Sequence, residues 1–205
     1  MNSSKWTFDM SVEAQQGYLR LLAKNGNFRF HNIVCSGAAH GDNDYKEIFP
    51  DSDIVFVDMV SGVGIDYAWN LEESPPKELE NSCDLFISTS VLEHVEKPWL
   101  AAKNIMKTVS SKGLIFITVP WAWEYHAFPR DYWRMSPDAL DVLFDGSTAI
   151  HTSWVTYPDG IGYRDWKDLP AVAGSYAEGK NLSGTNCKAR IHPVVQIFQV
   201  RQMNG

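Results

Sequence analysis

The chain has 205 residues, of which 44% are hydrophobic and 21% charged, and this composition is that of a globular rather than a disordered protein. The length suits one domain with a single well-buried α/β core. The net charge of −7 argues against a nucleic-acid partner, since binding to a phosphate backbone relies on clustered lysine and arginine.

No apolar run approaches the roughly 20 residues that a membrane-spanning helix needs, so we expect no membrane partner. The first residues, MNSSKWTFDM, lack the basic and apolar regions of a signal peptide, which predicts a cytoplasmic protein. The cysteines lack the paired spacing of a zinc site, and we expect reduced thiols and no metal ion; they are Cys35, Cys83 and Cys187.

Helix and strand signals alternate along the first half of the chain. The periodicity of residues 11–26 predicts a leading helix with Leu19 and Leu22 on its apolar face and Gly26 as its stop. Short apolar runs follow, typical of parallel strands buried on both faces: HNIVCS (31–36), DIVFVDM (53–59), CDLFISTS (83–90) and GLIFITVP (113–120).

Two more helices are predicted around the last of these strands. Residues 97–113 carry Pro98 in the first turn and Gly113 just past the expected end. Residues 135–144 have Ser136 as N-cap and a proline at the first helical position. The segments TAIHTSWVTYP and HPVVQIFQVRQ then read as an antiparallel strand pair, so the sequence predicts a doubly wound, mostly parallel sheet with helices on both faces.

Ligands bind to such sheets beyond the carboxyl ends of the strands. After the first strand, Gly37, Ala39 and Gly41 let the backbone approach a ligand closely, although small residues in such a turn often serve packing only. The second strand ends at Asp58, about 20 residues after the glycine turn, where a carboxylate can accept both hydroxyl hydrogens of a ribose. The pairing of these features predicts a site for an adenosine-containing ligand.

The stretch CDLFISTSVLEHVEKPWLAAKNIMKTVSSKGLIFITVP, with YHAFPRDYWR after it, resembles class I S-adenosylmethionine-dependent methyltransferases of the type 11-like group. The resemblance covers roughly residues 31–144. It implies a Rossmann-like seven-stranded sheet with a C-terminal antiparallel pair, S-adenosylmethionine as cofactor and S-adenosylhomocysteine as product. It also implies a single methyltransferase domain, 1–205, with a leading helix region (1–30), a cofactor-binding core (31–144) and a C-terminal strand pair and loop (145–205).

The same resemblance implies which residues hold the cofactor. The glycine turn passes the methionine moiety, Asp58 holds the ribose and Met59 flanks the adenine. Asn70 stands where the family often has an aspartate that bonds the adenine amino group, and its amide oxygen can accept that bond. The implied cofactor-binding residues are Gly37, Ala38, Ala39, Gly41, Asp58, Met59, Asn70, Leu71, Ser88 and Thr89.

Two positions depart from the family pattern, since Cys35 replaces an acid and Ala39 replaces a glycine. The lost carboxylate ordinarily helps to fix the cofactor amino group, although Asp42 or Asp44 could substitute for it. A non-catalytic module that binds S-adenosylmethionine therefore stays open as an alternative. An oxidoreductase is disfavoured because the GxGxxG turn of dinucleotide-binding proteins is missing.

The aromatic segment PWAWEYHAFPRDYWRMSP (120–137) could wall a substrate pocket or form a lid stabilised by its own packing. His126 is the best candidate for a general base, because imidazole titrates near neutrality, and Tyr132 or Asp131 could orient it or the acceptor. Arg134 could bind an acidic group of the substrate or pair with Asp131 or Asp138.

The catalytic candidates are therefore His126, Tyr132 and Arg134, while His94 in VLEHV is expected to have a structural or cofactor-side role. No Asn-Pro-Pro-Tyr-type element follows the fourth strand, which again disfavours methylation of nucleic acid. The favoured acceptor is a small molecule or a glycan-related hydroxyl, methylated on oxygen by direct displacement. The oligomeric state is not predicted.

Overall fold

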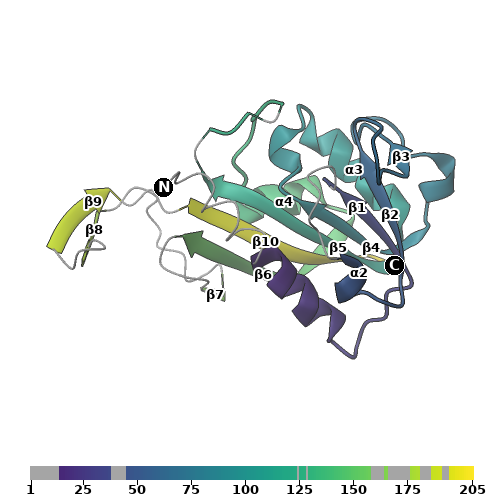
Figure 1. The fold of residues 1–205 in the computed structure, drawn as a ribbon, viewed down its shortest axis with the longest axis horizontal. Helices are drawn as coiled ribbons and strands as arrows, with labels where there is room; N and C mark the ends of the chain where they lie inside the picture. Colours follow the sequence, from purple (N-terminus) through teal and green to yellow (C-terminus); the bar gives the residue numbers. More distant parts are fainter. Residues whose placement is uncertain are drawn as a thin grey trace.

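The computed structural model describes residues 14–37, 45–123, 125–127, 129–157, 164–165, 176–180, 186–190 and 194–205. Within these ranges, eight strands form one sheet in the order β3-β2-β1-β4-β5-β10-β6-β7 (Figure 1). The parallel strands are β1 (Asn32–Ser36), β2 (Asp53–Asp58), β3 (Tyr67–Ala68), β4 (Cys83–Thr89) and β5 (Val109–Ala122).

Three strands complete this sheet in antiparallel pairings: β10 (Val194–Met203), β6 (Ser147–Tyr157) and the two-residue β7 (Arg164–Asp165). The doubly wound fold class and the C-terminal antiparallel pair are thus confirmed, with β10 lying between β5 and β6 and β7 added at the edge. A second sheet holds only β8 (Tyr176–Lys180) and β9 (Asn186–Arg190).

Helices cover both faces of the large sheet (Figure 1). One face carries the leading helix, residues 14–23, and α2 (Tyr45–Ile48), and the other carries α3 (Pro98–Thr108) and α4 (Pro137–Leu143). Alternation along β4 shows why both faces need cover, since Leu85 packs with the leading helix whereas Phe86 packs with α3 and α4. None of the helices that the structure describes is long and apolar enough to span a bilayer.

The predicted helix over residues 97–113 is wrong at its end, because α3 stops at Thr108. The carbonyls of Lys107 and Thr108 accept hydrogen bonds from the amides of Asn81 and Ser82, at 2.8 and 2.9 Å. These bonds satisfy the end of the helix and let the chain turn directly into β5, which contains Gly113.

The other two predicted helices hold, with a small shift in one. Ser136 caps α4 as expected, its Oγ accepting the amide hydrogen of Ala139 at 3.2 Å. Leu19 and Leu22 are buried under the sheet as predicted, but the described part of the leading helix ends at residue 23, before Gly26.

Candidate active site

The parallel strands β1 to β5 bring their carboxyl ends to one edge of the sheet. The parallel register sets Ser36, the last residue of β1, beside Val57 of β2 and Ser88 of β4. Gly37 therefore lies near the strand end at Asp58, which in turn pairs with Ala68 of β3, two residues before Asn70. Several other expected positions lie outside the described residues: Ala38, Ala39, Gly41, Asp42 and Asp44.

Gly37 fills a position that only glycine suits. Its φ is +81°, in the left-handed region. A Cβ at this position would lie 2.6 Å from Cγ2 of Val91 and 3.3 Å from the carbonyl oxygen of Thr89. The turn after β1 is therefore pressed against the segment that follows β4.

Asp58 and Asn70 are fixed by local hydrogen bonds. Oδ1 of Asp58 accepts from the amide of Val60 at 3.2 Å, and Oδ1 of Asn70 accepts from the amide of Glu72 at 3.1 Å. Carboxylate and amide oxygens retain further lone pairs for a ligand. Met59 between them is 57% exposed, while the Leu71 side chain is buried and its carbonyl accepts from Asn104.

The end of β4 carries two buried hydroxyls. The Ser88 hydroxyl is fully buried and has no partner among the described residues. The Thr89 hydroxyl lies 3.5 Å from that of Tyr45. Both residues stand at the expected strand end, and both are buried.

Cys35 points into the core rather than toward the edge. It packs with Tyr45 and the leading helix, and burial raises the pKa of its thiol well above the usual value. Burial likewise raises the pKa of Cys83, to about 12. Both are free thiols, as expected, while the side chain of Cys187 lies outside the described residues.

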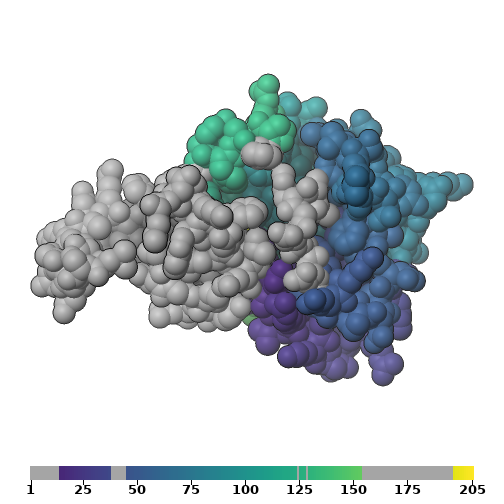
Figure 2. All heavy atoms as spheres, viewed as in Figure 1, coloured from purple at the N-terminus to yellow at the C-terminus, as the bar shows by residue number. Residues whose placement is uncertain are grey.

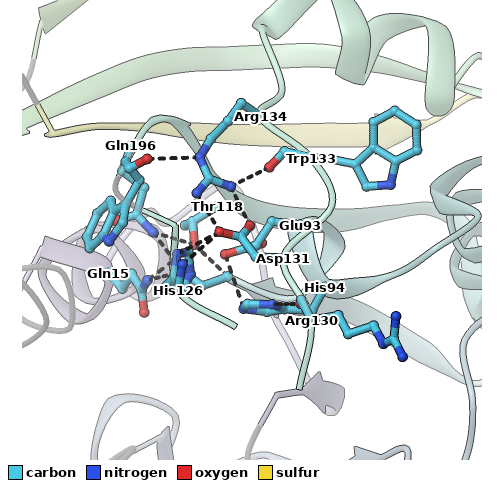
Figure 3. Close-up of polar contacts among 12 residues, drawn as sticks. Gln15, Glu93, His94, Thr118, His126, Arg130, Asp131, Trp133, Arg134 and Gln196 are labelled. Carbon is cyan, nitrogen blue, oxygen red and sulfur yellow. Dashed lines mark hydrogen bonds and ion pairs between the residues drawn. The ribbon is translucent and has the colours of Figure 1, made fainter. Parts of the chain in front are cut away.

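A second group of side chains, here named the polar cluster, consists of Glu93, His94, His126, Asp131 and Arg134 (Figure 3). Glu93 and His94 come from the 3-10 turn η3 (Leu92–His94), and the others from the loop between β5 and α4. The backbone amides of Tyr132 and Trp133 donate to the Glu93 carbonyl at 2.8 and 3.3 Å, which docks the loop on η3.

Asp131 is the ionic centre of the polar cluster. Its carboxylate accepts two hydrogen bonds from Arg134, at 2.5 and 2.6 Å, and one from the His126 amide at 2.9 Å. The Nδ1 of His126 lies 3.3 Å from Oδ2 of Asp131. Burial favours a raised pKa for Asp131, but the hydrogen bonds from Arg134 and His126 prevail and lower it to about 2. The pairing also raises the pKa of Arg134, so both groups stay charged at neutral pH.

Glu93 is a buried carboxyl with an unsatisfied oxygen. It is 1% exposed, and its Oε2 has no partner among the described residues. Burial raises the pKa of Glu93 to about 8, so the group is mostly protonated at neutral pH.

His94 bridges Glu93 and the loop. Its Nε2 lies 3.9 Å from Oε1 of Glu93, and its Nδ1 lies 2.6 Å from the Arg130 carbonyl. Burial lowers the pKa of His94, which favours the neutral imidazole. The rings of His94 and His126 meet edge to face with centroids 5.0 Å apart, so two imidazoles and a carboxyl share one small volume.

A buried amide and hydroxyl network connects this region to the far strands. Nε2 of Gln15, on the leading helix, donates to the hydroxyls of Ser90 and Thr118 at 3.2 and 3.3 Å. Nε2 of Gln196, on β10, donates to the same hydroxyls at 2.9 and 3.3 Å (Figure 3). The network ties the leading helix, β5 and β10 together.

Two of the sequence-predicted catalytic residues meet in this cluster. His126 and Arg134 both contact Asp131, so of the alternatives for Arg134 the pairing with Asp131 is the one present. Tyr132 joins through its backbone, and its side chain is 41% exposed. The loop stands at the molecular surface, as Figure 2 shows in green.

Sequence reasoning missed Glu93, Gln15 and Gln196. The signal for Glu93 was available, since an acid directly after Leu92 interrupts the apolar pattern of VLEHV. The two glutamines carried no such signal. They lie far apart in the chain and meet only through the fold.

No protein-family model matches the chain, and no curated protein matches it either. Solved structures do match. N-methyltransferase NodS from Bradyrhizobium japonicum WM9, in complex with S-adenosyl-L-homocysteine, aligns with a TM-score of 0.56 and 11% identity, over 93% of this chain and 86% of that one. The 1,6-didemethyltoxoflavin-N1-methyltransferase from Burkholderia thailandensis, with bound 1,6-didemethyltoxoflavin and S-adenosylhomocysteine, aligns with a TM-score of 0.63 and 13% identity, over 98% and 81%.

The [4+2]-cyclase SpnF also aligns, with a TM-score of 0.56 and 10% identity, over 92% of this chain and 80% of that one. The chain thus has the Rossmann-like fold of S-adenosylmethionine-dependent methyltransferases. Identities this low establish the fold, and one fold carries different reactions.

Proposed function

We propose that this protein is an S-adenosylmethionine-dependent methyltransferase that methylates an oxygen of a small molecule or sugar-type acceptor. The observation that carries the proposal is the single edge that Gly37, Asp58 and Asn70 share at the carboxyl ends of adjacent strands. Ligands of doubly wound sheets bind there. Structural neighbours that hold S-adenosylhomocysteine support the same cofactor.

The residues present at the edge fit this cofactor. Gly37 leaves no side chain between the turn and the end of β4, Asp58 offers a carboxylate for the ribose hydroxyls, and Asn70 offers an amide oxygen for the adenine amino group. Met59, Leu71, Ser88 and Thr89 complete the proposed set, together with the glycine turn. The cofactor supplies an activated methyl group on a positively charged sulfur.

His126 is the proposed general base. Asp131 holds its ring from the Nδ1 side, and Arg134 keeps Asp131 ionised. With the cofactor bound, its sulfonium would supply the methyl group to the acceptor oxygen, and His126 would accept the hydroxyl proton. Tyr132 and Arg134 are proposed to position the acceptor and the base.

One alternative keeps the cofactor without catalysis. It is favoured by Cys35, whose buried thiol offers no carboxylate for the cofactor amino group. The [4+2]-cyclase among the neighbours illustrates that the fold also serves other chemistry.

Calorimetric titration with S-adenosylmethionine, S-adenosylhomocysteine and NAD separates these possibilities. We expect both sulfur compounds to bind and NAD not to bind. If neither sulfur compound binds, the proposal is refuted. Binding without methyl transfer, in assays with radiolabelled cofactor and a panel of phenols and sugars, would favour the non-catalytic module.

We propose that residues 1–205 act as one methyltransferase domain on a small-molecule or glycan-related substrate, without a nucleic-acid or membrane partner. The free thiols of Cys35 and Cys83 support a reducing, cytoplasmic location. Gel-shift and vesicle-binding assays at low salt should both be negative.

A further inference from the structure

We infer that Glu93, His94 and His126 form a binding site for a divalent transition-metal ion. One potential ligand atom from each side chain lies within 4.8 Å of the other two, and Oε1 of Glu93 is 3.9 Å from Nε2 of His94. Ligand atoms around a four-coordinate ion with bonds of about 2.1 Å stand about 3.4 Å apart. Small side-chain rotations therefore suffice to close the site.

The unsatisfied oxygen of Glu93 is the independent sign of a ligand. The side chain is 1% exposed, and Oε2 has no partner among the residues described. Leaving a buried polar atom unpaired costs about 1–3 kcal/mol, so such atoms are rare and need an explanation. A cation coordinated by this carboxylate would remove that cost.

The two histidines are held as metal-binding histidines usually are. A ligating imidazole commonly has its ring oriented by a carbonyl or carboxylate at its other nitrogen. The Arg130 carbonyl lies 2.6 Å from Nδ1 of His94, which leaves Nε2 directed toward Glu93. Asp131 contacts the ring of His126 and is itself fixed by Arg134.

The donor set indicates the kind of ion. Two imidazole nitrogens and one carboxylate suit Zn²⁺, Co²⁺, Fe²⁺ or Mn²⁺, whereas Mg²⁺ and Ca²⁺ prefer oxygen ligands alone. Three protein ligands leave a coordination position open for a substrate oxygen, as in catalytic zinc sites. Loading the site requires Glu93 to lose its proton, so affinity should rise with pH.

A role for the ion in binding the acceptor rests on the proposed function. The ion would hold the acceptor oxygen and lower the pKa of its hydroxyl. In that case His126 serves as a ligand, and the hydroxyl proton leaves to solvent rather than to His126. Metal binding itself needs no methyl transfer and can be tested apart from it.

The test is titration of metal-stripped protein with Zn²⁺ by calorimetry and with Co²⁺ by visible absorption. We expect one ion to bind, with Co²⁺ bands of nitrogen and oxygen ligands and no thiolate charge-transfer band. Glu93→Gln, His94→Ala and His126→Ala should each weaken binding by more than about 100-fold, and Asp131→Asn by about 10- to 100-fold. His31→Ala, which removes an exposed imidazole at the start of β1, should bind as the wild type does.

Circular dichroism and thermal melting establish that each variant is folded. The inference would be overturned if the wild type bound no metal ion or gave a thiolate band. It would also be overturned if the three ligand variants bound the ion as tightly as the wild type does, whatever their stability. Titration of the same samples with S-adenosylhomocysteine separates the two proposals. Cofactor binding without metal binding refutes only the metal site, and metal binding without cofactor binding refutes only the proposed function.

Discussion

The edge at Gly37, Asp58 and Asn70 and the polar cluster place their functional groups by different means. At the edge, each group lies at the end of a strand or within two residues of it, and local hydrogen bonds from backbone amides fix the side chains of Asp58 and Asn70. In the polar cluster, the ion pair of Asp131 and Arg134 orders the loop before α4, and hydrogen bonds and a ring contact join that loop to Glu93 and His94 of η3. The edge should therefore tolerate loss of a side chain, whereas the cluster should not.

The largest expected effect is the pH dependence that Glu93 imposes on the cluster. The folded protein keeps the Glu93 proton up to about pH 8, whereas the unfolded chain releases it near pH 4.3. The folded state binds more protons between these values, so stability should fall as pH rises from about 4 to 8, by on the order of 4 kcal/mol. Glu93→Gln should remove this fall in metal-free protein.

Urea unfolding of the wild type and Glu93→Gln across this pH range measures the effect. Glu80→Gln, which changes an exposed carboxyl, is the control and should follow the wild type. Parallel stability profiles for wild type and Glu93→Gln would show that Glu93 titrates normally.

Removal of the ionic centre should have the next largest effect. Asp131→Ala leaves the Arg134 guanidinium without its carboxylate and should cost about 3 kcal/mol of unfolding free energy. In the wild type, the lowered pKa of Asp131 means that this contribution is present above about pH 4 and is lost as the pH falls toward 2.

The control is Asp141→Ala, which removes the exposed carboxylate that pairs with Arg201. Both arginines keep other acceptors, but the Asp141 side chain is 56% exposed whereas that of Asp131 is 1% exposed, so the loss at Asp141 should be smaller. Denaturant unfolding at pH 7 compares the two. Equal losses would mean that the cluster is no more dependent on its charges than an ion pair with an exposed carboxylate.

At the edge, Gly37→Ala tests backbone placement and should cost roughly 2 kcal/mol, from a positive φ and a clash with Val91. Gly64→Ala is a close control, because Gly64 has the same φ of +81° and nothing within 4 Å of its would-be Cβ. Thermal unfolding of both variants separates the clash from the conformational cost. If Gly64→Ala costs as much, close packing at Gly37 is unimportant.

The same contrast explains what the sequence could and could not predict. The edge was predictable because apolar runs mark strands, parallel strands align their carboxyl ends, and Gly37 and Asp58 directly follow such runs. The end of α3 was not predictable from the sequence, because the amides of Asn81 and Ser82 that terminate the helix come from a distant turn.

The polar cluster was predictable only in part. Aromatic and ionisable residues marked the loop that holds His126 and Arg134, and the pairing of Arg134 with Asp131 was one of the stated alternatives. Burial of Glu93 beneath this loop depends on tertiary packing of two segments, and no local pattern encodes that contact.

The smallest expected effect concerns a single side chain at the edge and rests on the proposed function. Asp58→Asn keeps the Val60 amide bond through the amide oxygen but loses the charge and one acceptor for the ribose hydroxyls. Affinity for S-adenosylhomocysteine should fall about tenfold, or about 1.4 kcal/mol, with little change in stability. Asp53→Asn, at the opposite end of β2, makes the same chemical change away from the edge and should leave calorimetric affinity unchanged. Equal affinities of both variants would remove Asp58 from the ribose site and leave the edge dependent on its backbone alone.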